Sequence, residues 1–228
     1  MKILVIDGSP RGEQSNTMVL TKAFLEGAGW AESTEFVPVP KLDIKGCVGC
    51  FTCWTTTPGV CVFKDDMEGI LPKIIAADVL IWSFPLYSSI MPGQLKVFMD
   101  RMLPLSLPEM MADTESGQHP LRYDMSKKKH MMISTCGFWT HRGNYDAVMA
   151  MFNRGGMDFQ TIFVGQGELF KVAKVDEGLR ELVTPFLDNV RKAGKEFAEG
   201  KITPETQDML AEPLLPQEVY ESFANASW

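Results

Sequence analysis

The sequence predicts an α/β protein built on a doubly wound parallel sheet of five strands. Short, almost purely apolar runs recur along the chain, as expected of strands that are covered on both faces. Segments with helical periodicity alternate with these runs, and such alternation is typical of right-handed β-α-β connections. The 228 residues are 45% hydrophobic, which is enough for a full core in one α/β domain.

The first strand is expected at Ile3–Ile6, because this apolar run ends abruptly at an Asp-Gly pair. A polar, glycine-containing loop follows and reaches Gln14. Ser15-Asn16-Thr17 can cap a helix that continues to about Gly27. Glu35–Val39 is expected to form a short second strand.

Three carboxylates between residues 65 and 68 are typical of the caps and first turn of a helix, which would end near Ala77 despite Pro72. The apolar run Val79–Phe84 predicts the third strand. The pattern in Gln94–Leu103 predicts the helix that follows it.

His130–Thr135 and Gln160–Val164 are expected to be the fourth and fifth strands, with Tyr145–Phe152 as the helix between them. Thr184-Pro185 resembles an N-cap followed by the first helical residue, and predicts the start of the last helix. The inner stripe of that helix would consist of Phe186, Val190, Ala193 and Phe197.

These elements place residues 1–200 in one domain, which includes a cysteine-rich loop at 46–62 and an insertion at 104–129. Residues 201–228 form a tail that we expect to pack on the surface or on a partner subunit. The insertion and the tail would leave apolar surface exposed on a monomer, so a homodimer or homotetramer is expected.

Charge and hydropathy exclude several classes of function. The formal net charge of −7 repels phosphate backbones, which argues against nucleic acid as a partner. The longest uncharged stretches are too short or too polar to cross a bilayer, and the N-terminus lacks the apolar core of a signal peptide. The expectation is a cytoplasmic protein with no membrane partner, whose cysteines are thiols or metal ligands.

The turn Gly8–Thr17 lies where the first strand ends and a helix begins, and it is suited to bind a phosphate. It offers hydroxyl groups, the charge of Arg11 and the free amides of a helix N-terminus. It is neither a Walker loop nor the dinucleotide fingerprint, because the required lysine and glycine spacings are absent. The alternative is an ordinary βα turn with a good cap.

Gly8-Ser9-Pro10-Arg11 followed by Ser15-Asn16-Thr17 resembles the phosphate loop of the flavodoxin-like NADPH-dependent FMN reductases. Further motifs stand in the order of that family: Asp65-Asp66-Met67, Pro85-Leu86-Tyr87, Leu95-Lys96 and Asp100-Arg101. The resemblance covers about residues 1–165 and implies strand order 2-1-3-4-5 with bound FMN. It assigns the phosphate to Ser9, Arg11, Ser15, Asn16 and Thr17, the ring to Pro85, Leu86, Tyr87 and Ser88, and a third loop to Cys136, Gly137, Phe138 and Trp139.

The favoured function is an FMN-dependent NAD(P)H oxidoreductase that reduces a small-molecule acceptor: a quinone, a nitro or azo compound, or free flavin. Aromatic side chains beside backbone amides after the third and fourth strands suit a flat, amphipathic ring, although they could equally close the core. The flavin performs the chemistry, with NAD(P)H as a transient co-substrate. His141, just after the third loop, is the candidate proton donor.

Four of the five cysteines form the pattern C-x2-C-x2-C-x7-C: Cys47, Cys50, Cys53 and Cys61. Thiolates at this spacing can reach the corners of a cubane cluster. The pattern resembles the motif of the iron–sulfur flavoproteins, which implies a [4Fe-4S] cluster beside FMN and ferredoxin as electron donor. A loop of small buried thiols, or a redox-reactive pair, are the alternatives. A non-enzymatic flavodoxin-like binding module is the third functional hypothesis.

Overall fold

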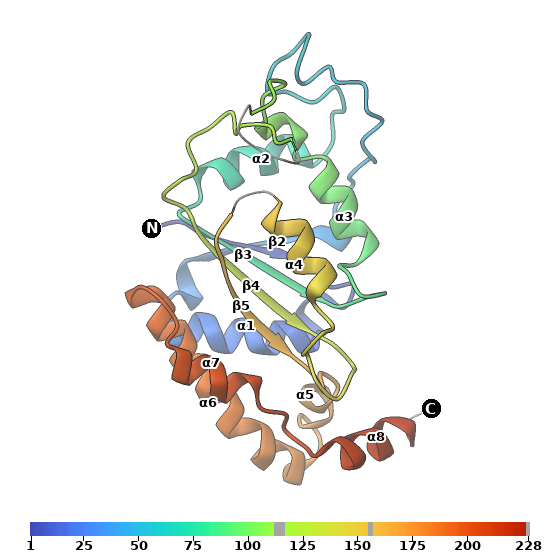
Figure 1. Ribbon diagram of the computed structural model, residues 1–228, viewed down its shortest axis with the longest axis vertical. Helices are drawn as coiled ribbons and strands as arrows, with labels where there is room; N and C mark the ends of the chain where they lie inside the picture. The colour runs from blue at the N-terminus through green and yellow to red at the C-terminus, as the bar shows by residue number, and fades with distance from the viewer. Residues whose placement is uncertain (112–116, 155–156, 227–228) are drawn as a thin grey trace.

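The computed structural model describes residues 1–111, 117–154 and 157–226, and it contains the expected sheet of five parallel strands (Figure 1). The strand order is β2-β1-β3-β4-β5, which confirms the predicted flavodoxin-like topology. Each observed strand lies within one residue of its expected bounds: β1 Ile3–Asp7, β2 Thr34–Pro38, β3 Val79–Pro85, β4 Lys129–Thr135 and β5 Phe159–Val164.

The order of the strands reverses at β1, which pairs with β2 on one side and with β3 on the other. Asp7, the last residue of β1, lies beside Ser83 of β3, and Ser83 lies beside Ile133 of β4. The carboxyl ends of these three strands therefore meet at one edge of the sheet, where ligands bind in open α/β folds.

Helices cover both faces of the sheet (Figure 1). One core joins the sheet to helices α1 and α6 and to the C-terminal segment, and the other joins it to α2, α3 and α4. Two further helices, α5 and α8, lie beyond the carboxyl ends of the strands. The helix bounds are α1 Asn16–Gly27, α2 Met67–Ala76, α3 Gly93–Asp100, α4 Asp146–Asn153, α5 Leu169–Val172, α6 Glu177–Glu199, α7 Pro204–Ala211 and α8 Gln217–Asn225.

Two helix boundaries differ from the expectation. Helix α3 ends at Asp100, and the chain continues through Arg101 into a 3-10 turn at Leu103–Leu105. The last long helix begins at Glu177 and not at Thr184-Pro185, because the carboxylate of Asp176 caps it by accepting the N–H of Leu179 (2.9 Å). Pro185 lies inside α6, where the packed apolar face outweighs its lost hydrogen bond.

The tail packs on its own subunit, because Ile202, Leu210 and Tyr220 are buried in the same core as β1 and β4. Residues 227–228 of the tail and 112–116 of the expected insertion lie outside the described residues. The described arms of the insertion pair through Leu107 N–H to the Pro120 carbonyl (2.9 Å). In the part of the chain that the structure describes, every helix is too short or too polar to cross a membrane.

Helices α1 and α6 pack closely because a glycine of each helix, Gly27 and Gly194, lies at their contact. A Cβ atom at Gly194 would overlap the carbonyl oxygen of Phe24, and one at Gly27 would overlap that of Arg191. Both obstacles are backbone atoms, which cannot rotate away. The two helices therefore lie closer together than any larger side chain at these positions would allow.

Gly194→Ala should lower the free energy of unfolding by about 1–3 kcal/mol, because the added methyl group forces α1 and α6 apart. Urea denaturation measures the change. Gly178→Ala is the matched control in the same helix, since its Cβ would meet only the Asp176 carboxylate at 3.5 Å. That control should be neutral or stabilising by up to about 1 kcal/mol. Equal losses in the two variants would contradict the close approach.

Candidate functional site

The turn between β1 and α1 presents free amide groups at a helix N-terminus. The hydroxyl of Ser15 accepts the N–H of Met18 (3.0 Å), which confirms the predicted N-cap. Among the hydrogen bonds of the described residues, none uses the N–H of Asn16 or Thr17. The side-chain oxygen of Asn16 is buried and also lacks a partner there. The two free N–H groups, with the positive end of the helix dipole, suit an anion, whereas the Asn16 oxygen is an acceptor and suits a donor.

A pocket of about 540 Å³ opens above this turn. It combines the phosphate turn with the loops that follow β3 and β4. The predicted residues that line it are Ser9, Arg11, Ser15, Asn16, Thr17, Pro85, Leu86, Tyr87, Cys136 and Gly137. The structure therefore brings together side chains that are up to 128 positions apart in the sequence, from 9 to 137.

Three residues predicted for this pocket do not line it. Ser88 is exposed at the tip of a tight turn, with φ 48°, between Tyr87 and Ile90, which pair with each other. Phe138 points outward and is 55% exposed. Trp139 packs against the core on the α1 face.

His141 also lies away from this pocket. It borders a smaller pocket of about 240 Å³ that the loop after β4 forms with Leu210 and Glu212 of the C-terminal segment. Burial and the nearby charge of Arg142 lower the pKa of His141. Although His141 closely follows the third loop in the sequence, the structure places it outside the pocket above the β1–α1 turn.

Three lining residues escaped the sequence analysis: Thr135, Gly167 and Glu168. Thr135 ends β4, and its hydroxyl is hydrogen-bonded to that of Thr17 (2.6 Å), which ties the strand to α1. Gly167 and Glu168 follow β5. The signal that could have found them is their position just after a strand, because every such segment of a parallel sheet meets the same edge.

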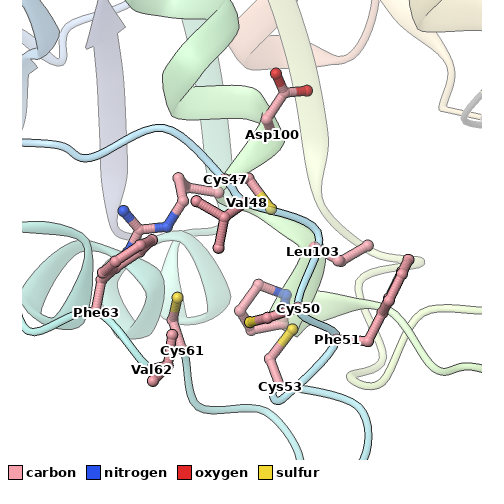
Figure 2. A pocket seen from close by; sticks show the side chains of 12 residues that line it. Cys47, Val48, Cys50, Phe51, Cys53, Cys61, Val62, Phe63, Asp100 and Leu103 are labelled. Carbon is pink, nitrogen blue, oxygen red and sulfur yellow. The ribbon is translucent and has the colours of Figure 1, made fainter.

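A second pocket, of about 340 Å³, is bordered by all four clustered cysteines, Cys47, Cys50, Cys53 and Cys61 (Figure 2). Apolar side chains of the cysteine segment and of the 3-10 turn after α3, with the charged Asp100 and Arg101, complete its wall. Burial and the neighbouring thiols, Cys61 foremost, raise the pKa of Cys53. Across the described residues, no three His, Cys, Asp or Glu side chains gather closely enough to hold a single metal ion.

A buried ion pair supports the cysteine pocket. Arg101, at the end of α3, donates two hydrogen bonds to Asp65 (2.6 and 3.0 Å), and these side chains are 1% and 0% exposed. Arg101 also donates to the carbonyl of Lys45 (2.6 Å), and Asp65 accepts the Lys45 N–H (3.1 Å). The pair therefore fixes the backbone two residues before Cys47.

Burial opposes the charge on Asp65, but the bonds from Arg101 and Lys45 outweigh it and lower the pKa of that carboxyl. The carboxylate also accepts the N–H of Met67 (3.2 Å), so it serves the start of α2 as predicted. Its principal partner is a residue 36 positions away. Asp100, next to Arg101, instead forms an exposed pair with Lys96 (2.7 Å).

Comparison with known proteins places these features in context. A model of the NADPH-dependent FMN reductase family matches residues 1–167. An iron–sulfur flavoprotein of Methanocaldococcus jannaschii is 36% identical over 107 residues, which are 47% of this chain and 54% of that protein. This chain thus spans about half the length of the iron–sulfur flavoproteins that it matches.

Two solved structures share the fold. An azoreductase from Bacillus anthracis str. Sterne superposes with a TM-score of 0.59 at 18% identity, covering 86% of this chain and 100% of that one. An NAD(P)H:quinone oxidoreductase from Methanothermobacter marburgensis superposes with a TM-score of 0.57 at 17% identity, with the same coverage of 86% and 100%. At such low identities the likeness concerns the flavodoxin-like architecture alone.

Arg101→Met should lower the free energy of unfolding by about 3–5 kcal/mol, because it leaves the Asp65 carboxylate buried without its partner. Urea denaturation at pH 7 measures the loss. Lys96→Met in the same helix is the control, since its exposed pair with Asp100 contributes about 0.5 kcal/mol or less. A cost for Arg101→Met as small as that of the control would refute the structural role of the buried pair.

Proposed function

The chain belongs to the NADPH-dependent FMN reductase family, and from that membership we propose that it binds FMN in the pocket above the β1–α1 turn. Bound FMN would take a hydride from NAD(P)H and pass the two electrons to a small-molecule acceptor. Members of this family are oxidoreductases, so a non-enzymatic binding module no longer stands as a hypothesis.

The observation that carries this proposal is the pocket itself, in which an anion site lies beside loops suited to a ring. The unpartnered N–H groups of Asn16 and Thr17, with Arg11 beside them, would hold the phosphate. The segment Pro85-Leu86-Tyr87 offers an apolar wall, and Gly137 lets backbone approach closely. Both halves of a mononucleotide are thus met by groups of matching chemistry.

The residues that line this pocket would orient the flavin ring and leave one side of the ring accessible to solvent. Tyr87 is 45% exposed at the rim of the pocket, so a co-substrate can reach the ring from solvent there. NAD(P)H would bind transiently at this rim, followed by the acceptor. Quinones, nitro and azo compounds and free flavin are the acceptors we propose, because each is flat enough to stack in the same place.

An iron–sulfur flavoprotein, with ferredoxin as electron donor, is the second candidate. It is favoured by the four thiols that border a single pocket and by the names of the relatives at about one-third identity. A cubane cluster holds its four thiolates farther apart than a single ion does, so thiols spread around one cavity suit a [4Fe-4S] cluster. The guanidinium of Arg101, which lines the same pocket as Cys61, would offset the negative charge gathered there.

We also propose a homo-oligomer and a reducing compartment, the cytoplasm. Exposed apolar side chains concentrate on the cysteine loop and the insertion: Val48, Phe51, Val60, Val62, Met110, Met111 and Leu121. A second copy would cover them, and sedimentation at micromolar concentration tests this. The five cysteines are all free thiols in the structure, as a reducing compartment requires.

Arg11→Ala should weaken FMN binding by about ten- to a hundredfold, because a hydrogen bond to a charged group contributes about 1.5–3 kcal/mol. Titration of FMN fluorescence against the apoprotein measures the dissociation constant. Lys22→Ala is the matched control, since it removes one positive charge from an exposed pair with Glu13 on the same turn and helix. Equal affinities for the Arg11 variant and the wild type would remove Arg11 from the phosphate site.

Protein purified without oxygen should contain about four iron and four sulfide per chain if the second candidate is right. Cys53→Ser should then lose the iron and the broad visible absorption of the cluster. Cys136→Ser, at the buried cysteine of the other pocket, should keep both. Iron-free wild-type protein that is reduced by NADPH would exclude the cluster and retain the first candidate.

A further inference from the structure

The loop after β4 is fixed through its carbonyl groups. Each carbonyl from residue 136 to residue 140 accepts a hydrogen bond from another part of the chain. The donors are the Gly167 N–H to Cys136, the Tyr220 hydroxyl to Gly137, the Gln166 N–H to Phe138, the Gln166 side-chain amide to Trp139 and the Asn144 side-chain amide to Thr140, at 2.7–3.1 Å. Because these carbonyl groups already accept hydrogen bonds within the protein, the groups that the loop can offer a ligand are backbone N–H donors.

One of those donors, the Gly137 N–H, lies at the pocket. Within residues 1–111, 117–154 and 157–226, no protein acceptor takes the N–H of Gly137 or Trp139. Gly137 lines the proposed flavin pocket. The ring system of FMN carries carbonyl oxygens, which are hydrogen-bond acceptors. The Gly137 N–H, beside a carbonyl that Tyr220 already engages, is therefore complementary to that ring.

Three of the five bonds come from Tyr220, in the C-terminal segment, or from Gln166, which anchors that segment. Tyr220 belongs to α8 and donates to the Gly137 carbonyl at 2.9 Å. The side chain of Gln166 bonds the Trp139 carbonyl (3.1 Å) and, at the same time, both backbone groups of Leu215 (2.7 and 2.9 Å). The loop is thus joined to the tail directly at Gly137, through Tyr220, and indirectly at Trp139, through Gln166.

These contacts are costly to build, which argues that they are specific. Gln166 is 1% exposed and adopts φ 56°, a left-handed conformation that a non-glycine residue rarely holds. A Cβ atom at Gly165 would lie 2.8–2.9 Å from backbone atoms of Thr140 and Phe138, so the loop passes where only glycine fits. Tyr220 is also 1% exposed, and its ring packs in the core.

We propose that residues 202–226 complete the flavin site, with Tyr220 as a positioning residue that holds the Gly137 N–H toward the FMN ring. Burial foremost, with the charge of Glu168, raises the pKa of Tyr220 to about 12, so the hydroxyl remains a donor at neutral pH. Because coupling between two sites is reciprocal, FMN binding should in turn hold α8 more firmly on the domain. This inference rests on the proposed FMN pocket.

Tyr220→Phe tests the proposal, because it removes the hydroxyl and keeps the buried ring. FMN should bind the variant about three- to tenfold more weakly than it binds the wild type. At saturating FMN, the visible absorption bands and the midpoint potential of the bound flavin should also shift. A residue that merely stabilised the fold would leave the spectrum and potential of the saturated protein unchanged, and that result would overturn the proposal.

Tyr123→Phe is the matched control, since it lies in the described part of the insertion, outside the flavin pocket. Its FMN affinity and flavin spectrum should match those of the wild type. Thermal unfolding of both apoproteins shows whether loss of stability accounts for any difference. Failure of the wild type itself to bind FMN would instead refute the proposed function, so the two failures are distinguishable.

Hydrogen exchange tests the reciprocal effect. Amides of α8, Gln217–Asn225, should exchange more slowly after FMN is added to the wild type, and this slowing should be smaller in Tyr220→Phe. Helix α2, which belongs to the core on the opposite face of the sheet, is the internal control and should be unaffected. Unchanged exchange in α8 of the FMN-saturated wild type would contradict the coupling.

Discussion

The arrangement of this molecule depends on the parallel pairing of β1, β3 and β4, which brings three strand ends to one edge. The walls of the proposed flavin pocket begin at these ends and just after β5, so the sheet sets the distance between loops that are remote in sequence. Buried hydroxyl pairs reinforce the register: Thr17 bonds Thr135 (2.6 Å), and Thr21 bonds Ser83 (2.8 Å). Such bonds are strong where water is excluded, and they hold α1, which carries the anion site, to the strands that carry the ring-binding loops.

The strands were predictable because each is a short apolar run, and the N-cap of α1 at Ser15 was predictable because capping is a local signal. The start of α6 was missed because Asp176 and Thr184 are both good caps, and only packing of Val183 on the core decides between them. In the pocket, backbone positions were found but side-chain directions were not: Phe138 follows a strand as Cys136 does, yet it points to solvent. The partner of Asp65 was equally hidden, since nothing local relates residues 65 and 101.

Helix α3 connects the two pockets. It begins just after the loop that contains Tyr87 and ends at Asp100, beside the cysteine pocket. Its eight residues rise about 12 Å at about 1.5 Å per residue, so the two sites are one short helix apart. Because Arg101 and Asp65 clamp the cysteine loop to the end of this same helix, the loop is positioned relative to the flavin pocket by rigid structure.

The ring of Tyr220 packs the tail against the core, whereas its hydroxyl contacts the loop at the proposed flavin pocket. A phenylalanine would fill the same core position, and burying a hydroxyl is unfavourable unless it finds a partner. The partner here is the carbonyl of Gly137 in the pocket loop. The family match ends at residue 167, next to Gln166, from which the loop and the tail are both held. The proposed flavin site therefore depends on residues beyond those that the family model matches.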